Sequence, residues 1–320
     1  MKQIYSQDWI AYDKAKTQES KLFKLFLSEL LDIYFKQEIK IGKRISNKDR
    51  LLMMALKVYY NTDMRKCKCI IEEFTGKKIS YKSLSNFFED ESLSQILDDL
   101  ILISSLPTAN LETTGAIDAT GFSTSGFENW NTNKWGTKPY KKDTTRIWRK
   151  LHAITGCKTN IFISVSVTKK NVADSKAFED TIGDKTKYFE LEDFVADKAY
   201  SSKKILDFLN KLNLNPIIPF KKNVTGRAKG SFIWMRMFKY FKDNEEEFMQ
   251  RYHKRSNVET CFHMLKKKFG NNIRTKSFNS NVNEIKIRCL CHNICVLIQE
   301  MYESNIDIDL KSCVNRIAFV

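Results

Sequence analysis

The sequence of 320 residues contains no apolar run long enough to cross a membrane as a helix, which takes about 20 residues. The run CLCHNICVLI is too short, and ILDDLILISSL is interrupted by two aspartates. The opening segment MKQIYSQDWIAYDKAKTQ lacks the apolar centre of a signal peptide, and neither a lipidation motif nor a basic amphipathic helix indicates a membrane surface. We therefore expect a cytoplasmic protein that has no membrane partner.

The sequence also lacks a common zinc-site spacing, although it contains eight cysteines and four histidines. Four of these residues lie together in an apolar segment: Cys289, Cys291, His292 and Cys295. On a helix their side chains would point in different directions, so a buried core helix is expected rather than a metal site. No zinc is expected, and in a cytoplasmic protein the cysteines should be free thiols.

Acidic residues are scarce relative to basic ones. The chain has 54 Lys and Arg residues against 38 Asp and Glu residues, which gives a formal charge of +16 and an isoelectric point near 9.3. An apolar fraction of 42% suits a folded protein with a sizeable core, and the length allows two domains. A folded protein with this positive charge is expected to bind a polyanion, nucleic acid first of all.

The first third of the chain is predicted to be helical. Apolar residues recur at helical spacing in ESKLFKLFLSELLDIYF and NKDRLLMMALKVYY. The stretch DMRKCKCIIEEFTGKKISYKSLSNFFED then predicts a helix, a Gly-containing turn and a second helix that Ser80 could cap. This pair is either a DNA-reading helix-turn-helix or a unit that only packs. SSLPTANLETTG breaks the pattern, so we place an all-helical N-terminal domain at residues 1–107.

Residues 108–301 are predicted to form a mixed α/β domain, followed by a tail at 302–320. GAIDATGFS indicates a strand that ends in a polar turn, and TTRIWRKLHAIT with IFISVSVT indicates a β-hairpin. Helix and strand patterns then alternate through DSKAFEDTI, YFELEDFVADKAY, SSKKILDFLNKL and NPIIPF. Three antiparallel strands, then helix, strand, helix, strand and helix, is the order of an RNase H-like fold, a mixed sheet flanked by helices.

The segment YHKRSNVETCFHMLKKKFG, residues 252–270, is predicted to be a helix with two distinct sides. At about 3.6 residues per turn, its apolar residues share one arc roughly 60° wide: Val258, Phe262, Leu265 and Phe269. A neighbouring arc of similar width holds its polar residues: Tyr252, Arg255, Glu259 and Lys266. The simple alternative is a solvated face on which these charges form helical ion pairs.

Two aspartates are expected at the ends of strands. Asp118 follows the apolar residues of GAID, and Asp197 follows those of FVAD. Functional groups gather at strand ends along one edge of an α/β sheet, although a single aspartate there is more often a turn former. Together with Glu259 they meet the needs of phosphodiester cleavage. Carboxylate oxygens can bind a pair of Mg²⁺ ions, which activate water and stabilise the leaving oxygen.

The same segments resemble a known family. The Tyr-Arg-Glu-Lys signature of insertion-sequence DDE transposases, Y-x2-R-x3-E-x6-K, is matched at every position by Tyr252, Arg255, Glu259 and Lys266. VADKAYSS is similar to the second acidic region of that group, with Ala199 where glycine is frequent. GAIDATGF is similar to the first acidic region. The resemblance covers residues 111–300 and is loose over the N-terminal helices.

The resemblance implies an RNase H-like catalytic domain that uses two Mg²⁺ or Mn²⁺ ions. The catalytic residues and metal ligands would be Asp118, Asp197 and Glu259. Tyr252, Arg255 and Lys266 would contact DNA phosphates near the cleaved transposon end. Water would attack first, and the freed 3′-hydroxyl would then attack target DNA without a covalent enzyme intermediate. The resemblance also implies a homodimer on paired ends, acting on double-stranded DNA at the nucleoid.

Basic residues outside the signature are expected to add DNA contacts without reading the base sequence. They are Lys198, beside the second aspartate, and Lys221 and Lys222 in a basic connector at 221–250. Two other functions stay open. One is an RNase H-like nuclease without strand transfer, and the other is a domesticated transposase that binds DNA but no longer cuts it. The intact acidic triad and signature favour an active transposase over the second of these.

Overall fold

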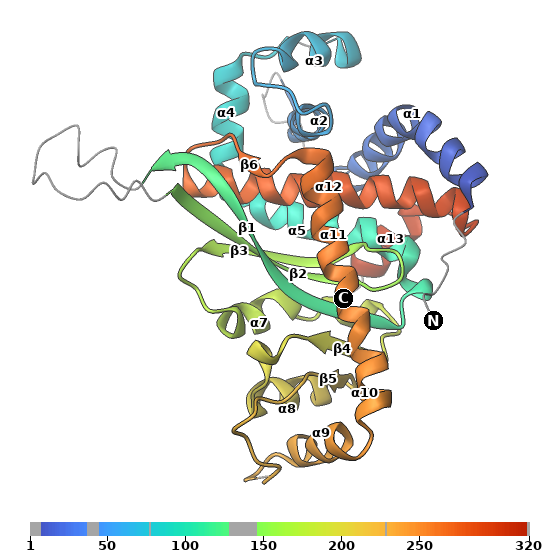
Figure 1. The fold of residues 1–320 in the computed structure, drawn as a ribbon. Helices are drawn as coiled ribbons and strands as arrows, with labels where there is room; N and C mark the ends of the chain where they lie inside the picture. The colour runs from blue at the N-terminus through green and yellow to red at the C-terminus, as the bar shows by residue number, and fades with distance from the viewer. Residues whose placement is uncertain (1–7, 37–44, 77, 128–145, 228, 319–320) are drawn as a thin grey trace, which may run out of the picture.

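The structure is a computed structural model that describes residues 8–36, 45–76, 78–127, 146–227 and 229–318. Figure 1 shows a twisted sheet in the middle of the molecule, with the first helices above it and later helices around and below it. The helices that precede the sheet are α1 (Trp9–Tyr34), α2 (Asn47–Tyr59), α3 (Cys67–Thr75), α4 (Tyr81–Glu89) and α5 (Ser92–Ser105). No helix among the described residues is long and apolar enough to cross a membrane.

α3 and α4 form the predicted helical pair. Gly76 ends α3 in the left-handed conformation, with φ of 64°, which a glycine adopts without steric cost. Ser80 caps α4, since its hydroxyl oxygen accepts a hydrogen bond from the backbone N–H of Ser83 at 3.1 Å. The local structure is therefore confirmed, while a role of this pair in reading DNA stays a prediction.

The sheet formed by the described residues has six strands. They are β1 (Thr114–Phe127), β2 (Arg146–Gly156), β3 (Phe162–Lys169), β4 (Asp193–Ala196), β5 (Asn215–Ile217) and β6 (Asn272–Ile273). Their order is β3-β2-β1-β4-β5, with β6 paired to the far end of β1. β1, β2 and β3 are antiparallel neighbours, whereas β4 and β5 run parallel to β1. This is the strand order of the predicted RNase H-like fold.

β1 is longer than the sequence predicts. A polar turn was expected after Asp118, but the strand continues to Phe127 and pairs with β2 along most of its length. Gly121 and Ser123, which favour turns locally, lie opposite Lys150 and Trp148. Pairing with a neighbouring strand outweighs weak local preference, because strand formation depends mainly on cross-strand packing.

The later helices surround this sheet. They are α7 (Asp174–Ile182), α8 (Lys203–Lys211), α9 (Phe232–Asp243), α10 (Glu245–Tyr252), α11 (Ser256–Phe269), α12 (Phe278–Glu303) and α13 (Leu310–Ala318). Short 3₁₀ turns join some of the elements: η1 (Leu106–Leu111), η2 (Lys185–Tyr188), η3 (Lys198–Tyr200) and η4 (His253–Arg255). The basic connector thus leads into an amphipathic helix, α9, and the segment expected to be a tail contains α13.

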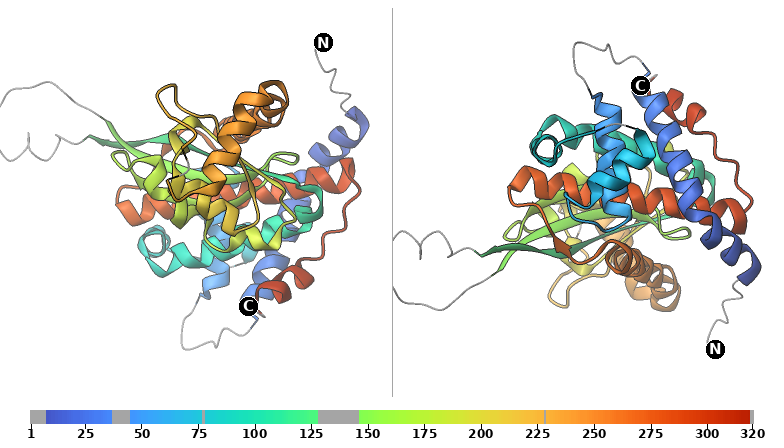
Figure 2. Two further views of the ribbon diagram at one scale, coloured as in Figure 1. Left: turned by 90° about the horizontal axis from the view of Figure 1, so that it is seen from below. Right: turned by 90° about the horizontal axis from the view of Figure 1, so that it is seen from above.

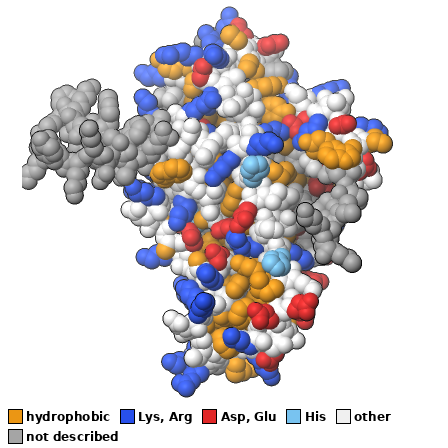
Figure 3. Space-filling model, viewed as in Figure 1, with side chains coloured by type: hydrophobic (Ala, Val, Ile, Leu, Met, Phe, Trp, Pro, Cys, Tyr) orange, Lys and Arg blue, Asp and Glu red, His pale blue; other side chains and the backbone are white. Residues whose placement is uncertain are grey.

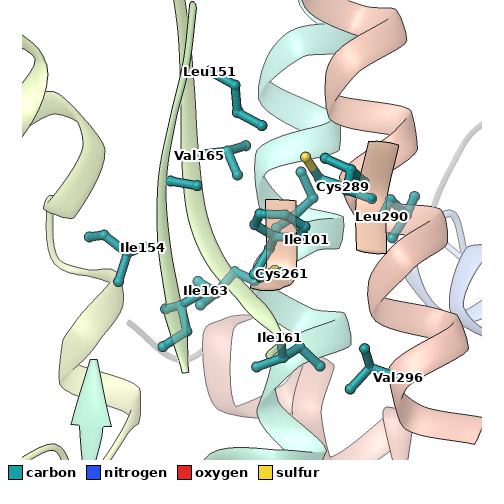
Figure 4. Packing of buried hydrophobic residues seen from close by; sticks show 14 of the residues in the cluster. Ile101, Leu151, Ile154, Ile161, Ile163, Val165, Cys261, Cys289, Leu290 and Val296 are labelled. Atoms are coloured by element: carbon teal, nitrogen blue, oxygen red, sulfur yellow. The ribbon is translucent and has the colours of Figure 1, made fainter. Parts of the chain in front are cut away.

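The two faces of the sheet carry different helices. Lys266 of α11 donates a hydrogen bond to Thr120 of β1, whereas Lys150 of β2 donates to Asp174 of α7 on the opposite face. Figure 4 shows Leu151 of β2 pointing toward α5 and α12, with Ile154 on the other side of the strands. The side chains of the strands alternate between these faces, as the pleat requires. α11 therefore covers the face on which α5 and α12 also pack.

α12 is the buried centre of the molecule. Every residue from Ser280 to Ile298 is buried, which confirms the predicted core helix. Its polar side chains have partners within the protein; Asn293, for example, exchanges hydrogen bonds with the backbone of Phe162 at 2.8 Å in both directions. α1, α2 and α5 pack on α12, and Figure 2 shows α12 passing between the sheet and the helices α1 and α2. One hydrophobic cluster runs from Ala15 to Cys313, so the boundary near residue 107 stays a prediction.

Cys291 and Cys295 of α12 have separate partners. The thiol of Cys291 points to the backbone carbonyl of Ala55 at 3.6 Å, and that of Cys295 lies 3.1 Å from the amino group of Lys268. His292 lies 2.9 Å from the carbonyl oxygen of Asn160. The side chains diverge around the helix as the sequence predicts.

Candidate active site

The neighbouring strands β1 and β4 bring Asp118, within β1, next to Asp197, the residue that follows β4. β1 and β4 are parallel, and the last paired residues are Ile117 and Ala196, so each aspartate is the next residue of its chain. β4 ends there. The carboxylate of Asp197 accepts a hydrogen bond at 2.5 Å from the backbone N–H of Lys198 and caps η3. The predicted position of Asp197 at a strand end is confirmed, whereas Asp118 lies inside the longer β1.

Glu259 of α11 is joined to Asp118 through Arg255. One guanidinium nitrogen donates to Oδ2 of Asp118 at 2.6 Å, and another donates to Oε1 of Glu259. The side chains of Arg255 and Asp118 are 20% and 23% exposed, whereas that of Glu259 is 58% exposed. A planar guanidinium carries five N–H donors and can serve two carboxylates at once. The structure thus brings a strand residue and two helix residues of the predicted site into contact.

The third carboxylate, that of Asp197, affects the pKa of Asp118. Burial is the main cause that raises the pKa of Asp118 above its ordinary value. The N–H of Ala119 and the charge of Arg255 lower this pKa, while the charges of Asp197 and Glu259 raise it. Asp197 and Glu259 are therefore within electrostatic reach of Asp118. Both charges disfavour the charged form of Asp118, and a cation beside this carboxylate would relieve that effect.

These residues fit a hard divalent cation in their chemistry. Mg²⁺ and Mn²⁺ prefer carboxylate oxygens, and the repulsion felt by Asp118 is what such an ion would relieve. Among the described residues, no three His, Cys, Asp or Glu side chains lie together in a group that could hold a metal ion. The guanidinium of Arg255 lies between Asp118 and Glu259 and supplies positive charge there.

The segment before α11 is not one continuous α-helix. The prediction of a helix over 252–270 is wrong at its start, because α10 ends at Tyr252 and the 3₁₀ turn η4 precedes α11. A 3₁₀ turn advances by about 120° per residue instead of about 100°, which rotates Tyr252 and Arg255 relative to Glu259. Tyr252 still reaches the cluster. Burial raises the pKa of its hydroxyl, while the charge of Arg255 and a hydrogen bond with it lower that pKa.

The rest of α11 has the predicted sides. The apolar arc is buried as expected: Val258, Phe262, Leu265 and Phe269. On the other side, the amino group of Lys266 donates to Thr120 at 2.6 Å and lies 5.2 Å from the ring centre of Phe122. Burial lowers the pKa of Lys266. The amino group of Lys266 therefore lies against β1 close to the acidic cluster. Its partner, Thr120, is two residues beyond Asp118 in the strand.

The other basic residues are on the surface. Lys198, Lys221 and Lys222 are exposed. Figure 3 shows Lys and Arg side chains spread over the face on which α11 lies, with acidic side chains near the middle of that face. Such a distribution would present positive charge to a polyanion around an acidic centre.

Two further contacts were not predicted. Arg251, in the last turn of α10, pairs with the buried Asp193 at the start of β4, and Lys254 donates to Thr114 at the start of β1. No local pattern signals these contacts, since the partners are 58 and 140 residues apart in the chain. The only sequence signal is the closeness of both basic residues to the Tyr-Arg-Glu-Lys positions.

Comparison with known proteins identifies the family. The model of the family described as "Transposase DDE domain" matches residues 109–294, which is more than half of the chain. A curated relative, "Probable transposase for insertion sequence element ISA1214" of Archaeoglobus fulgidus, is 26% identical over 235 residues, covering 73% of this chain and 69% of the relative.

Solved structures add little to this assignment. The "Mos1 transposase paired-end complex with left transposon end" covers 73% of this chain and 83% of that chain at 11% identity, with a TM-score of 0.24. The "Crystal structure of the Mos1 mariner paired end complex with Mn" covers 72% and 82% at 11% identity, also with a TM-score of 0.24. Scores this low do not establish a shared fold. The match to the family model decides: the chain belongs to the Transposase DDE domain family and is a DNA transposase that uses divalent metal ions.

Proposed function

We propose that Asp118, Asp197 and Glu259 are the catalytic carboxylates and hold two Mg²⁺ or Mn²⁺ ions. The observation that carries this proposal is the cluster itself, in which two carboxylates share Arg255 and the third acts on Asp118. When bound, the ions would activate a water and stabilise the leaving oxygen of a phosphodiester. The chain's own residues would place the scissile phosphate against these carboxylates and keep the strand and helix ligands at a constant separation.

The basic residues around the cluster would bind the DNA backbone. Arg255 and Lys266 now contact groups of β1, and both would exchange these contacts for phosphate oxygens when DNA binds. Tyr252 would donate its hydroxyl to a phosphate beside them. Lys198, Lys221 and Lys222 would follow the backbone further out and contribute affinity without sequence readout. These groups would hold a transposon end while water, and then the freed 3′-hydroxyl, attacks a phosphodiester.

The wider assembly is proposed from the family resemblance. Two copies of the chain would act on paired transposon ends, in the cytoplasm and in association with the nucleoid. α3 and α4 would read the terminal repeats with the polar residues of α4, of which Lys82 is exposed. The alternatives are a nuclease without strand transfer and a DNA-binding protein that no longer cuts, and the next experiment separates both from a transposase.

The test is cleavage and joining of a supercoiled plasmid that carries DNA from the flanks of the gene, in the presence of Mg²⁺. Glu259→Gln keeps size and helix propensity but removes the charge that a metal ion needs. We expect cleavage to fall by orders of magnitude while affinity for the DNA ends stays level or rises, since a negative charge has left a phosphate-binding site. A transposase yields joined products, a nuclease only cut ones, and a binding protein neither.

Glu246→Gln is the matched control. Glu246 is an exposed residue of α10, and this change removes the same charge outside the cluster. Its cleavage rate should equal that of the wild type. If folded Glu259→Gln protein cuts DNA at the wild-type rate, the assignment of Glu259 is wrong.

A further inference from the structure

A partly buried ion pair ties α10 to β4. The guanidinium Nε of Arg251 donates to Oδ2 of Asp193 at 2.8 Å, and Nη2 donates to Oδ1, so the two groups meet as a fork. Asp193 is only 6% exposed. The Nη1 of Arg251 also donates to the hydroxyl of Tyr240 in α9 at 3.2 Å. A forked pair between a guanidinium and a carboxylate fixes direction as well as distance.

A second contact lies beside the first. The amino group of Lys254 in η4 donates to the hydroxyl of Thr114 at 3.1 Å. Thr114 and Asp193 are directly paired in the register of β1 and β4. Arg251 and Lys254 therefore dock on adjacent residues, at the first position of each of the two strands that lead to the aspartates.

The same spacing recurs in both strands. Asp118 follows Thr114 by four residues, and Asp197 follows Asp193 by four. Four residues of strand span about 13 Å. Arg255 follows in η4 and reaches Asp118 at the far end of this span, and it also donates to Glu259 of α11. The segment from Arg251 to Glu259 is therefore fixed to the first residues of β1 and β4 at one end. Its other end lies at the acidic cluster.

We propose that Thr114, Asp193, Arg251 and Lys254 form a base clamp that positions Glu259 against Asp118 and Asp197. Arg251 and Lys254 are positioning residues in this inference, which rests on the proposed function of the three carboxylates. The contacts of Arg251 and Lys254 with the first residues of β4 and β1 limit how far the segment from Arg251 to Glu259 can tilt or slide along the strands. Metal ligands on separate elements need such support, because a small error in their separation weakens binding.

The charges of the clamp make it sensitive to small changes. Asp193→Asn keeps the shape of the side chain but leaves Arg251 without a charged partner. Arg251→Lys keeps the positive charge but cannot form the fork. Both variants should therefore loosen the connection, and the second should do so with the smaller loss of stability.

The experiment compares these variants with a matched control in the full chain. Asp98→Asn breaks the ion pair between Asp98 and Lys286, whose atoms lie 2.7 Å apart with side chains 17% and 7% exposed. That pair joins α5 to α12 and touches none of the three carboxylates. The measurements are thermal unfolding, Mn²⁺ affinity by electron paramagnetic resonance, and single-turnover cleavage per folded molecule at a temperature well below unfolding.

All three variants should lower the unfolding temperature. Only Asp193→Asn and Arg251→Lys should weaken Mn²⁺ binding, by about tenfold, and slow DNA cleavage by the folded protein. Loss of stability in Asp193→Asn and Asp98→Asn alike, with wild-type Mn²⁺ affinity and cleavage in both, would overturn the clamp. If Asp193→Asn does not fold, Arg251→Lys decides by the same two measurements.

Glu259→Gln is included in the same series. If it binds Mn²⁺ and cleaves DNA like the wild type, the proposed catalytic site fails. If it is inactive while both clamp variants behave like the wild type, the site stands and only the clamp is wrong.

Discussion

Arg255 links residues that the linear sequence keeps far apart. Its contacts with Asp118 and Glu259 place one positive charge between two carboxylates. Burial still raises the pKa of Asp118, so the folded protein holds a proton on this group more tightly than the unfolded chain does. Stability associated with Asp118 is therefore lost as pH rises from the ordinary carboxyl range through the raised value. Burial of the Asp118 carboxyl thus costs stability on the alkaline side of this range.

Lys266 allows a test at the same scale. Lys266→Ala removes a charge that lies on β1 close to the acidic cluster, so binding to transposon ends should weaken. The slope of log affinity against log salt should flatten by about one unit, the value for one phosphate contact. The measurement is end binding by fluorescence anisotropy over a range of salt concentrations.

The control is Lys267→Ala, which removes the same charge from the next, exposed position of α11. It should change the slope less than Lys266→Ala does. Equal slopes for the two variants would mean that general positive charge, rather than the position of Lys266, determines the binding.

At the scale of elements, α11 and α12 meet beside the β2–β3 hairpin. His292 of α12 lies 2.9 Å from the carbonyl oxygen of Asn160, and its ring packs against Phe162 with centres 5.0 Å apart. Cys261 of α11 donates its thiol to the same carbonyl at 3.0 Å. This junction holds the helix that carries Glu259 against the central core helix.

Acid should weaken this junction through His292. Burial lowers its pKa to about 4, so the unfolded chain takes up a proton that the folded protein cannot. The stability is present at neutral pH and is lost as pH falls from about 6.5 to about 4, by up to about 3 kcal/mol. His292→Gln should be less stable at pH 7 but should lose less on acidification, measured by urea unfolding between pH 4 and 7.

His263→Gln is the control, since His263 is an exposed residue of α11. Its stability should follow the wild-type dependence on pH. If the stability of His292→Gln also falls with pH in parallel to that of the wild type, protonation of His292 does not cause the loss of stability in acid.

At the scale of the whole molecule, the N-terminal helices and the sheet share one core. α12 belongs to the later part of the chain, yet it packs against α1, α2 and α5 as well as β3. Polar contacts join the same parts, such as the amide of Asn283 with the carbonyl oxygens of Phe88 and Asp90, each at 2.9 Å. Separating the helices from α12 would expose apolar surface on both sides.

The full chain should therefore unfold in one transition. Because α12 is common to both parts, loss of either part removes packing from the other. Denaturant unfolding followed by far-ultraviolet circular dichroism, and by separate fluorescent labels on α4 and α8, should give coincident curves. Two resolved transitions, with the label on α4 changing apart from that on α8, would instead support an independent domain at residues 1–107.

Local sequence patterns by themselves determined the type and order of most helices and strands of this protein. The apolar spacing of α11 predicted its buried side, and the order of strand and helix signals predicted the RNase H-like sheet. The Tyr-Arg-Glu-Lys spacing and the two aspartate motifs indicated the family. Backbone geometry makes such predictions possible, since helix and strand repeats follow from neighbouring residues alone.

Only the tertiary structure decided the rest. The extension of β1 depends on its pairing with β2, and the contact of Arg255 with Asp118 joins residues 137 positions apart. The fork between Arg251 and Asp193 likewise arises between elements that meet only after the chain has folded. Local sequence carries no record of these partners, because their energies depend on burial and on distances that packing sets.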